Sequence, residues 1–514
     1  MSNQASDNLF RLIKSLNKPE KRYFKVFSSR ISGGEKSNYS VLFDAIDKQK
    51  EYDEAAIMKR FRKEAFIRSF SITKSRLYDA ILRSLDAYHA NSSTEAQLKK
   101  LLHCVEILYK KALYHQSARL LHSAKRIAEK YEKHTTLLEI FEWEKMLIEK
   151  DTYENTDEKA LEKMLSDDMR ILKKIEIFSN YWNVKSRLFF ILNKRGKARS
   201  EKEITGFKNI IDNTLLKSDS KDLYFRTEYL YNHIYSVYYF GIGDYKNSYT
   251  YLNKNVEHIE ANIDKFKDEP NIYFSLLTNI IYIGIQSKKY KEAFAFLENL
   301  RAMPEKLALT KNEDLDFRLF YSVYSTEQTI YYLMGEFEKG MDTIPIVEEG
   351  MKLYESKLSN VRKAFMFFNS ALICFGAEKY AQALKWTNRL LNDIDIKKSE
   401  DIYCFSQMLN LIIHFELGND RMIPYAIKST QRYLKTRNRV YKFETVFMIF
   451  INKMLKLDKK QQIQAYKELK PELEELKKDN FERTAFEYFD FLSWAESKIS
   501  GKPFKEIMKE KAKK

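Results

Sequence analysis

The chain has few of the residues that turns and crosslinks require. Its 514 residues include only 13 glycines, 7 prolines and 3 cysteines. A sheet protein of this length needs many tight turns, which use glycine, proline and asparagine, so a mostly β fold is excluded. Three scattered cysteines cannot form a disulfide framework and are typical of a reducing compartment. We therefore expect an all-α cytoplasmic protein, helical over about three quarters of its length.

Long apolar runs and targeting signals are also missing. The best runs, Val446 to Ile451 and Ile280 to Ile285, are six residues long, whereas a membrane span needs about 20 apolar residues. The first residues have neither a basic start nor an apolar stretch of signal-peptide length. We expect no membrane association.

Motifs for catalysis and cofactor binding are absent as well. The nearest phosphate-loop string, Gly34-Glu35-Lys36-Ser37, lacks the distal glycine and a preceding strand. The histidines between 89 and 134 offer only pairs on a helix, whereas structural zinc takes about four ligands. We expect no metal, no cofactor and no enzymatic activity, and keep an enzyme with an unfamiliar site as a minor alternative.

A turn motif recurs in the middle of the chain: a polar turn, an aromatic residue, and a small residue three positions later. The pairs are Tyr245 with Ser248, Tyr290 with Ala293, Phe337 with Gly340, and Tyr380 with Ala383. The aromatic positions 245, 290, 337 and 380 are 45, 47 and 43 residues apart. Because residues i and i+3 share a helix face, the small residue lets the preceding helix approach closely. The motif predicts antiparallel helical hairpins that pack through these eight residues.

In this motif the chain resembles the tetratricopeptide-repeat (TPR) superfamily, best over residues 230–395 and by period and helicity over 95–480. The resemblance implies a right-handed α-solenoid of TPR-like hairpins whose concave groove binds a protein or peptide. The family period is about 34 residues, so an irregular solenoid or an elaborated bundle stays open. We expect three regions: a basic helical region over 1–92, repeats over 93–480, and a capping helix with a basic tail over 481–514. The period places two of the hairpins at 136–175 and 177–217.

Aromatic and basic side chains are the candidates for partner binding. The chain has 34 tyrosines and a net charge of +17, which favours acidic partners. Tyrosine and arginine are the side chains that dominate many protein interfaces. The predicted partner-binding residues are Tyr231 and Tyr235 on one helix, and Arg432, Lys435, Arg437 and Arg439 in a stretch without acidic residues.

The N-terminal region has the densest positive charge, with 18 Lys and Arg against 11 Asp and Glu in residues 1–90. As a helix-turn-helix, it would place Arg68, Lys74 and Arg76 together near a helix N-terminus, where phosphate binds. As a cap, it would instead pack Phe61, Phe66, Leu77, Ile81 and Leu85 on the first hairpin. We favour the cap.

The C-terminal tail is rich in lysine. Residues 502–514 hold six lysines and two glutamates and predict a frayed, solvated helix. The leading hypothesis is a scaffold that binds a protein or peptide, acidic in character. The alternative is a nucleic-acid-associated regulator with an N-terminal DNA-binding module and a TPR-like sensor region.

Overall fold

The protein is helical throughout the part of the chain that the structure describes. The computed structural model describes residues 7–31, 38–154, 156–198, 200–212, 216, 224–309, 313–392, 400–435, 442–479, 482 and 484–513. It is 84% helical, and no strand occurs among these residues. The predicted all-α class is therefore confirmed. None of the described helices combines the length and the apolarity that crossing a membrane requires.

The chain divides into two compact units, Met1–Ser179 and Asn180–Lys514. In the first unit, helices near the N-terminus enclose a core of their own, in which Phe24 and Phe43 pack with Leu77 and Ile81. These helices are α1 (Asn8–Ser15), α2 (Lys18–Ile31), α3 (Asn38–Lys48), α4 (Glu54–Arg60) and α5 (Phe70–His89), with a 3-10 turn at Ala65–Ser69.

This core corrects one expectation for the N-terminal region. As a cap, the region would have packed its apolar residues on the first repeat hairpin. Phe66, Leu77 and Ile81 are instead buried with residues of α1 to α3, and Phe61 and Leu85 lie at the edge of the same core. The predicted packing is wrong because the short helices supply enough apolar surface to bury these residues among themselves.

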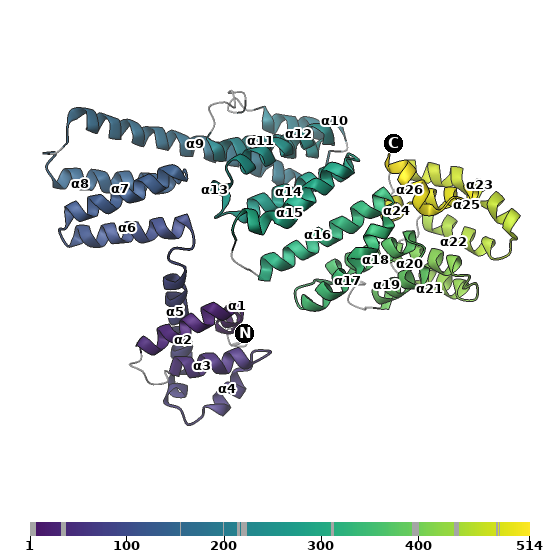
Figure 1. The fold of residues 1–514 in the computed structure, drawn as a ribbon, viewed down its shortest axis with the longest axis horizontal. Coiled ribbons are helices and arrows are strands. Elements are labelled where there is room, and N and C mark those ends of the chain that lie inside the picture. The colour runs from purple at the N-terminus through teal and green to yellow at the C-terminus, as the bar shows by residue number, and fades with distance from the viewer. Residues whose placement is uncertain are drawn as a thin grey trace. The chain divides into compact units, whose positions relative to one another are not determined.

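Three helices then follow in antiparallel order. α6 (Thr94–Lys110) packs on α7 (Tyr114–Lys130), and α7 packs on α8 (His134–Lys150) (Figure 1). Leu102, Leu121 and Ile140 are buried in this layer together with Ile171 of the next helix, α9. This second core completes the first unit.

α9 (Glu158–Arg195) is one long helix where the sequence analysis predicted the end of one hairpin and the start of another. Residues 158–195 contain no glycine and no proline. Ser179 and Asn180 are the best candidates for a break, and such residues alone seldom end a helix that packing supports. The predicted boundary between hairpins 136–175 and 177–217 is therefore wrong.

The described part of the second unit contains six further helical hairpins, each made of a first helix and a second helix packed on it. The pairs are α11 (Phe225–Gly241) with α12 (Tyr245–Ala261), α14 (Pro270–Gln286) with α15 (Tyr290–Lys306), α16 (Glu313–Met334) with α17 (Phe337–Leu353), α18 (Asn360–Gly376) with α19 (Tyr380–Asn392), α20 (Glu400–Glu416) with α21 (Ile423–Lys435), and α22 (Lys442–Met454) with α23 (Lys459–Lys478). Before them, α10 (Glu201–Ile211) packs on α11, and α13 (Ile263–Phe266) links α12 to α14. The first helices α16, α18, α20 and α22 pack on one another in this order.

One turn geometry joins the helices of several hairpins. The residue two positions before the second helix has a positive φ: 83° at Gly243, 57° at Lys288, 69° at Gly335, 58° at Glu378, and 60° at Ala112 before α7. The next residue donates its N–H to the carbonyl five positions earlier, as Lys289 does to Gly284 at 2.8 Å. This Schellman arrangement satisfies carbonyls that the end of the helix leaves open. Since the turn has a fixed length, the second helix begins at the predicted aromatic residue each time.

The predicted packing contacts form beside these turns. All four small residues are buried: Ser248, Ala293, Gly340 and Ala383. Phe337 is fully buried too, but Tyr245, Tyr290 and Tyr380 are half-buried. The tyrosine hydroxyl explains part of the difference in burial between Phe337 and the three tyrosines. The hydroxyl of Tyr245, for example, accepts a hydrogen bond of 2.7 Å from Lys197. Three of the rings lie against the aromatic residue five positions earlier, with centroids 6.3 Å apart for Phe240–Tyr245, 6.0 Å for Tyr332–Phe337 and 5.3 Å for Phe375–Tyr380.

The α6–α7 hairpin carries the same motif, which the sequence analysis missed. Tyr114 lies 5.3 Å from the ring of Tyr109, again five positions earlier. The hydroxyl of Ser117 donates to the carbonyl of Val105 at 3.0 Å. Ser248 makes the equivalent bond in the α11–α12 hairpin, also to a carbonyl 12 residues earlier, at 2.9 Å. An aromatic residue with serine three positions later was the signal available in the sequence.

The C-terminal segment packs back on the second unit. It consists of α24 (Thr484–Tyr488), α25 (Phe491–Ser500) and α26 (Phe504–Ala512), and α26 contacts α16. Phe504, Ile507 and Met508 are buried, and Lys505 pairs with Glu338 at 2.8 Å. The prediction of a frayed, solvated tail is wrong, because the apolar residues along one face of α26 pack on the hairpins.

Candidate interaction site

The first helices of the second unit carry little charge for so charged a chain. Charged residues make up 31% of the sequence, yet α14 has none over its 17 residues. Its exposed residues follow helical spacing and are Asn271, Ser275, Asn279, Tyr282 and Gln286. A solvated helix face normally carries charges, whereas amides and hydroxyls suit hydrogen bonds to a partner's backbone. This uncharged face is the first candidate surface.

The neighbouring helix α16 contacts this face through the charged side chain of Arg318. Arg318 of α16 donates to the side chain of Asn271 at 2.6 Å, and its guanidinium lies 4.4 Å from the ring centroid of Phe274. On the other side, Asn369 of α18 donates to the carbonyl of Ser325 at 3.0 Å. These contacts link α14, α16 and α18 through polar side chains, so the α14 face lies beside α16, where the row of α16, α18, α20 and α22 begins.

Farther along this row, the C-terminal segment covers the first helices. Tyr488 lies against Phe368 of α18 and Phe405 of α20, with centroids 5.8 and 4.5 Å apart. Phe491 packs 5.0 Å from Phe447 of α22. The backbone N–H of Asp490 donates to the hydroxyl of Tyr332 on α16 at 2.9 Å. Residues 488–491 therefore contact α16, α18, α20 and α22, the first helix of each of four consecutive hairpins.

Trp494 fixes the segment at its centre. Its side chain is 1% exposed and packs on Phe447 and Tyr466. The indole N–H donates to Glu416 at 2.7 Å, and Lys498 bonds the other oxygen of this carboxylate at 2.6 Å. The Glu416 side chain is only 8% exposed, and a buried carboxylate needs such partners. The indole ring and the carboxylate thus depend on each other for burial.

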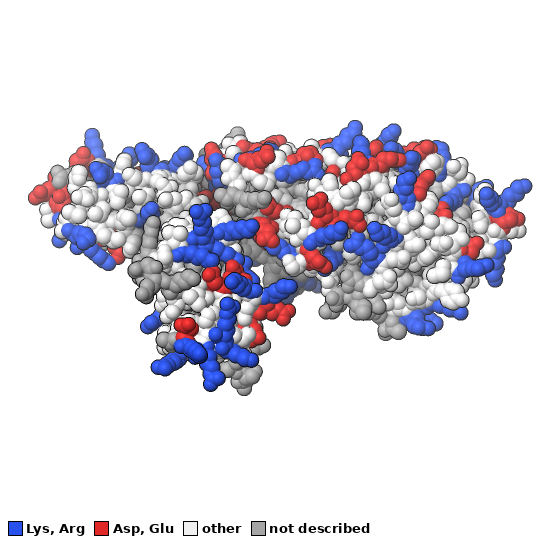
Figure 2. Space-filling model, turned by 60° about the horizontal axis from the view of Figure 1, so that its bottom comes forward, with Lys and Arg blue, Asp and Glu red and all other residues white. Residues whose placement is uncertain are grey.

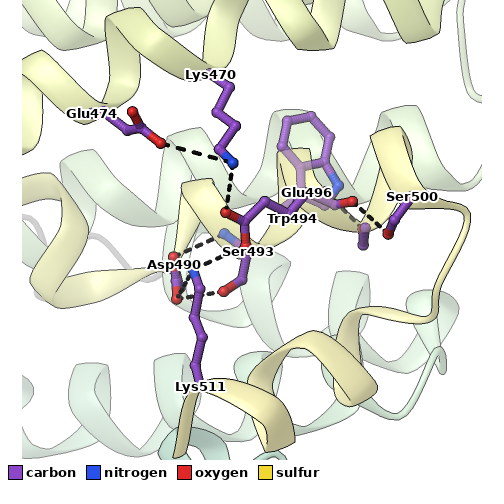
Figure 3. A network of polar contacts seen from close by, with 9 residues as sticks. Lys470, Glu474, Asp490, Ser493, Trp494, Glu496, Ser500 and Lys511 are labelled. Atoms are coloured by element: carbon purple, nitrogen blue, oxygen red, sulfur yellow. Dashed lines mark hydrogen bonds and ion pairs between the residues drawn. The ribbon is translucent and has the colours of Figure 1, made fainter. Parts of the chain in front are cut away.

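Ion pairs at the rim hold the same segment (Figure 3). Glu496 pairs with Lys470 of α23 at 3.1 Å and with Lys511 of α26 at 3.4 Å. Asp490 caps α25 by accepting from the N–H of Ser493 at 2.9 Å, and it also faces Lys511. Exposed pairs of this kind contribute little stability each. They orient the segment, while its buried aromatic rings provide the larger part of the binding.

The two tyrosines predicted as partner-binding residues belong to a cluster on α11 and α12. Tyr231 lies 4.8 Å from Tyr235, and Tyr235 stacks on Tyr251 at 5.0 Å. Tyr239 also stacks on Tyr251 at 5.7 Å and lies 6.4 Å from Tyr235. All four rings are half-buried, and burial raises the pKa of Tyr235 above its ordinary value, with Tyr231 adding to the effect. The cluster offers aromatic edges and hydroxyls, so partner binding here stays a prediction.

His233, on the same helix as Tyr231 and Tyr235, is buried between two rings. It stacks on Phe189 and on Tyr229, both with centroids 5.6 Å away. Its Nδ1 has no hydrogen-bond partner among the described residues. Burial, with a smaller effect of Lys185, lowers the pKa of His233 to about 3. The folded protein therefore holds this imidazole neutral at any ordinary pH.

This histidine should make the second unit sensitive to acid. The pKa of His233 is lower in the folded chain than in the unfolded chain, where it is about 6.5. Below pH 6.5 the unfolded state binds a proton that the folded state does not, so stability falls as the pH falls. From pH 7 to pH 5 the expected loss is about 2 kcal/mol. His233→Phe should remove this part of the pH dependence in urea denaturation measured at both pH values.

Two further histidines test whether His233 causes this pH dependence. As a control, His122→Phe makes the same substitution at an exposed histidine. Burial also lowers the pKa of His414, so a residual slope in the same direction should persist in His233→Phe. Equal slopes for the wild type and His233→Phe would contradict the burial of a neutral imidazole.

The structure describes only two of the four basic residues that were predicted to bind a partner near α21. Arg432 and Lys435 are exposed at the end of α21. Arg437 and Arg439 lie outside the described residues. Elsewhere Lys and Arg are interspersed with Asp and Glu over the visible face (Figure 2). Contact of Arg432 and Lys435 with an acidic partner stays a prediction.

The three cations predicted to contact nucleic acid are not exposed together. Arg68 and Arg76 are exposed. Lys74 is only 15% exposed, because it pairs with Glu54 at 2.6 Å and lies over the ring of Phe70. The predicted shared surface therefore does not include Lys74, and a contact of Arg68 and Arg76 with nucleic acid stays a prediction.

Within the described ranges, no group of three or more His, Cys, Asp and Glu side chains could hold a metal ion. The uncharged face of α14 was not predicted, although a helix-length stretch without charged residues was visible in the sequence. No protein-family model and no curated protein matches this chain.

Proposed function

We propose that this chain is an interaction scaffold and not an enzyme: a right-handed α-solenoid of TPR-like hairpins that binds a protein or peptide along its first helices. We place it in the cytoplasm, because three cysteines in 514 residues are too few and too scattered for a disulfide framework. The first helices would form the binding groove, and the charged second helices would face solvent.

One observation carries the proposal: the first helices, which carry less charge than the chain as a whole, are covered in one part and open in another. Over α16 to α22 the cover is the chain's own segment 484–512, which inserts Trp494 and Phe491. On α14 the residues Asn271, Ser275 and Asn279 are exposed with no charge among them. A helix face that has neither charges nor a cover from the chain itself is best explained by a partner that lies on it.

The test adds one negative charge to the α14 face and, as a control, one to the exposed face of α15 in the same hairpin. Asn279 on α14 and Ala295 on α15 are both exposed, so Asn279→Glu and Ala295→Glu should both fold. The full chain and both variants are used for affinity purification from the native host after nuclease treatment. Proteins retained by the wild type and by Ala295→Glu should be lost with Asn279→Glu. Retention of the same proteins by all three would exclude the α14 face.

The second candidate function is the nucleic-acid-associated regulator. It is favoured by the independent core of α1 to α5 and by the exposed Arg68 and Arg76. Binding through these cations should weaken steeply with salt, since each neutralised phosphate adds close to one unit to the log–log slope. Duplex DNA that is retained in low salt by the wild type, and released by Arg68→Ala/Arg76→Ala, would support this function over the scaffold.

A further inference from the structure

An open groove of about 450 Å³ lies between α2 and the end of α5. Its lining residues are Lys18, Pro19, Arg22, Tyr23, Val26 and Tyr88. Val26 is 48% exposed and Tyr88 41% exposed, so two large apolar side chains remain in solvent here. The floor of the groove is therefore apolar and aromatic, and its edge is basic.

The walls of this groove are held in place by contacts on both sides. The rings of Tyr23 and Tyr88 touch, with centroids 5.1 Å apart, and Tyr23 also stacks on Phe27. Glu20 at the start of α2 bonds to Nε2 of His89 at the end of α5, at 2.8 Å. This bond ties the two helices together beside the groove. A ligand would meet a surface that is already formed, which lowers the entropic cost of binding.

The charge at the edge of the groove is uncompensated. Lys21 and Lys25 on the same helix pair with Asp47 and Asp44, each at 2.7 Å. Lys18 and Arg22, one turn apart, have no ion pair with any carboxylate among the described residues. The start of α2 adds the positive end of a helix dipole. Because no acidic residue lines the groove, its potential favours an anionic ligand.

We propose that this groove binds an acidic peptide segment of a partner protein, with one apolar or aromatic side chain seated on Tyr23, Val26 and Tyr88. Carboxylates that flank this side chain would reach Lys18 and Arg22. A single-stranded nucleic acid fits less well, because the groove offers aromatic surface for one side chain and no platform for successive bases. Two cations at one edge also do not form the continuous track that a phosphate backbone follows. This site is separate from the uncharged face of α14 and selects a partner of different chemistry.

The test uses the full chain and a short fluorescein-labelled peptide in which one Trp is flanked by Asp and Glu. Fluorescence anisotropy should show binding by the wild type that weakens with salt, because exposed charges are screened. The charge-reversal pair Lys18→Glu/Arg22→Glu and, separately, Tyr88→Ser should each weaken binding about tenfold or more. Both changes are on exposed side chains, and circular dichroism would verify the fold.

A control variant and two further probes decide whether the peptide binds in the groove itself. Arg62 and Lys63 are exposed on the same region but do not line the groove, so Arg62→Glu/Lys63→Glu should bind as the wild type does. A peptide with Ser in place of Trp should bind more weakly. The proposal is overturned if the wild type does not bind the peptide, or if both charge-reversal pairs weaken binding equally. It is also overturned if a single-stranded oligonucleotide of equal charge binds more tightly than the peptide.

Discussion

Gly376→Val should lower the free energy of unfolding of the second unit by about 3 kcal/mol, near the upper end of the usual cost of overpacking. Gly376 is the last residue of α18 and is buried against α17. A Cβ at this position would lie 2.2 Å from two ring carbons of Phe337. Phe337 cannot move aside, because it is fully buried and stacks on Phe504. Urea denaturation followed by far-UV circular dichroism measures the loss.

A second glycine provides the matched control. Gly206 lies within α10, and a Cβ built there meets no atom within 4 Å. Gly206→Ala should therefore raise stability by about 0.5–1 kcal/mol, since alanine favours the helix more than glycine does. If Gly376→Val were as stable as the wild type, the close packing of α17 on α18 would be refuted.

Trp494→Ala should lower stability by about 3–5 kcal/mol, the usual range for a fully buried tryptophan. The change removes the ring that packs on Phe447 and Tyr466. It also leaves the buried carboxylate of Glu416 with Lys498 alone. Thermal or urea unfolding of the full chain gives the magnitude.

Trp182 is the natural comparison for Trp494. It lies on α9 and is 53% exposed, so Trp182→Ala should cost less than about 1 kcal/mol. Trp494→Phe should have an intermediate effect, because it keeps an aromatic ring and loses the hydrogen bond to Glu416. Equal losses for the two alanine variants would mean that segment 484–512 does not dock on the first helices.

The local features of the fold could be predicted from the sequence because they depend on near neighbours in the chain. Glycine at 243 and 335 and the aromatic residues that follow mark turns whose geometry is set within a few residues. The burial of Ala293 and Ala383 follows from the same motif. The unbroken α9 was missed because a break was extrapolated from the period, and no residue between 158 and 195 enforces one.

Features that depend on distant pairs could not be predicted in this way. The lysines of the C-terminal tail looked solvated because the partner of Lys505, Glu338, lies 167 positions away in the chain. Counting charges also could not show that Lys74 is paired with Glu54 while Lys18 and Arg22 are unpaired among the described residues. Net charge gives the sign of a surface, and only the fold shows which cations remain available.

The docking of segment 484–512 also sets an order for folding during synthesis. The ribosome releases α16 to α23 before this segment, and domains begin to fold as they emerge. Until residues 488–494 arrive, Phe368, Phe405 and Phe447 lack the rings of Tyr488, Phe491 and Trp494 that pack on them. The nascent chain therefore passes through a stage in which an aromatic surface is open, and general chaperones bind surfaces of this kind. Truncated products that end near residue 480 would stay at this stage, which makes them the natural targets of proteolytic quality control.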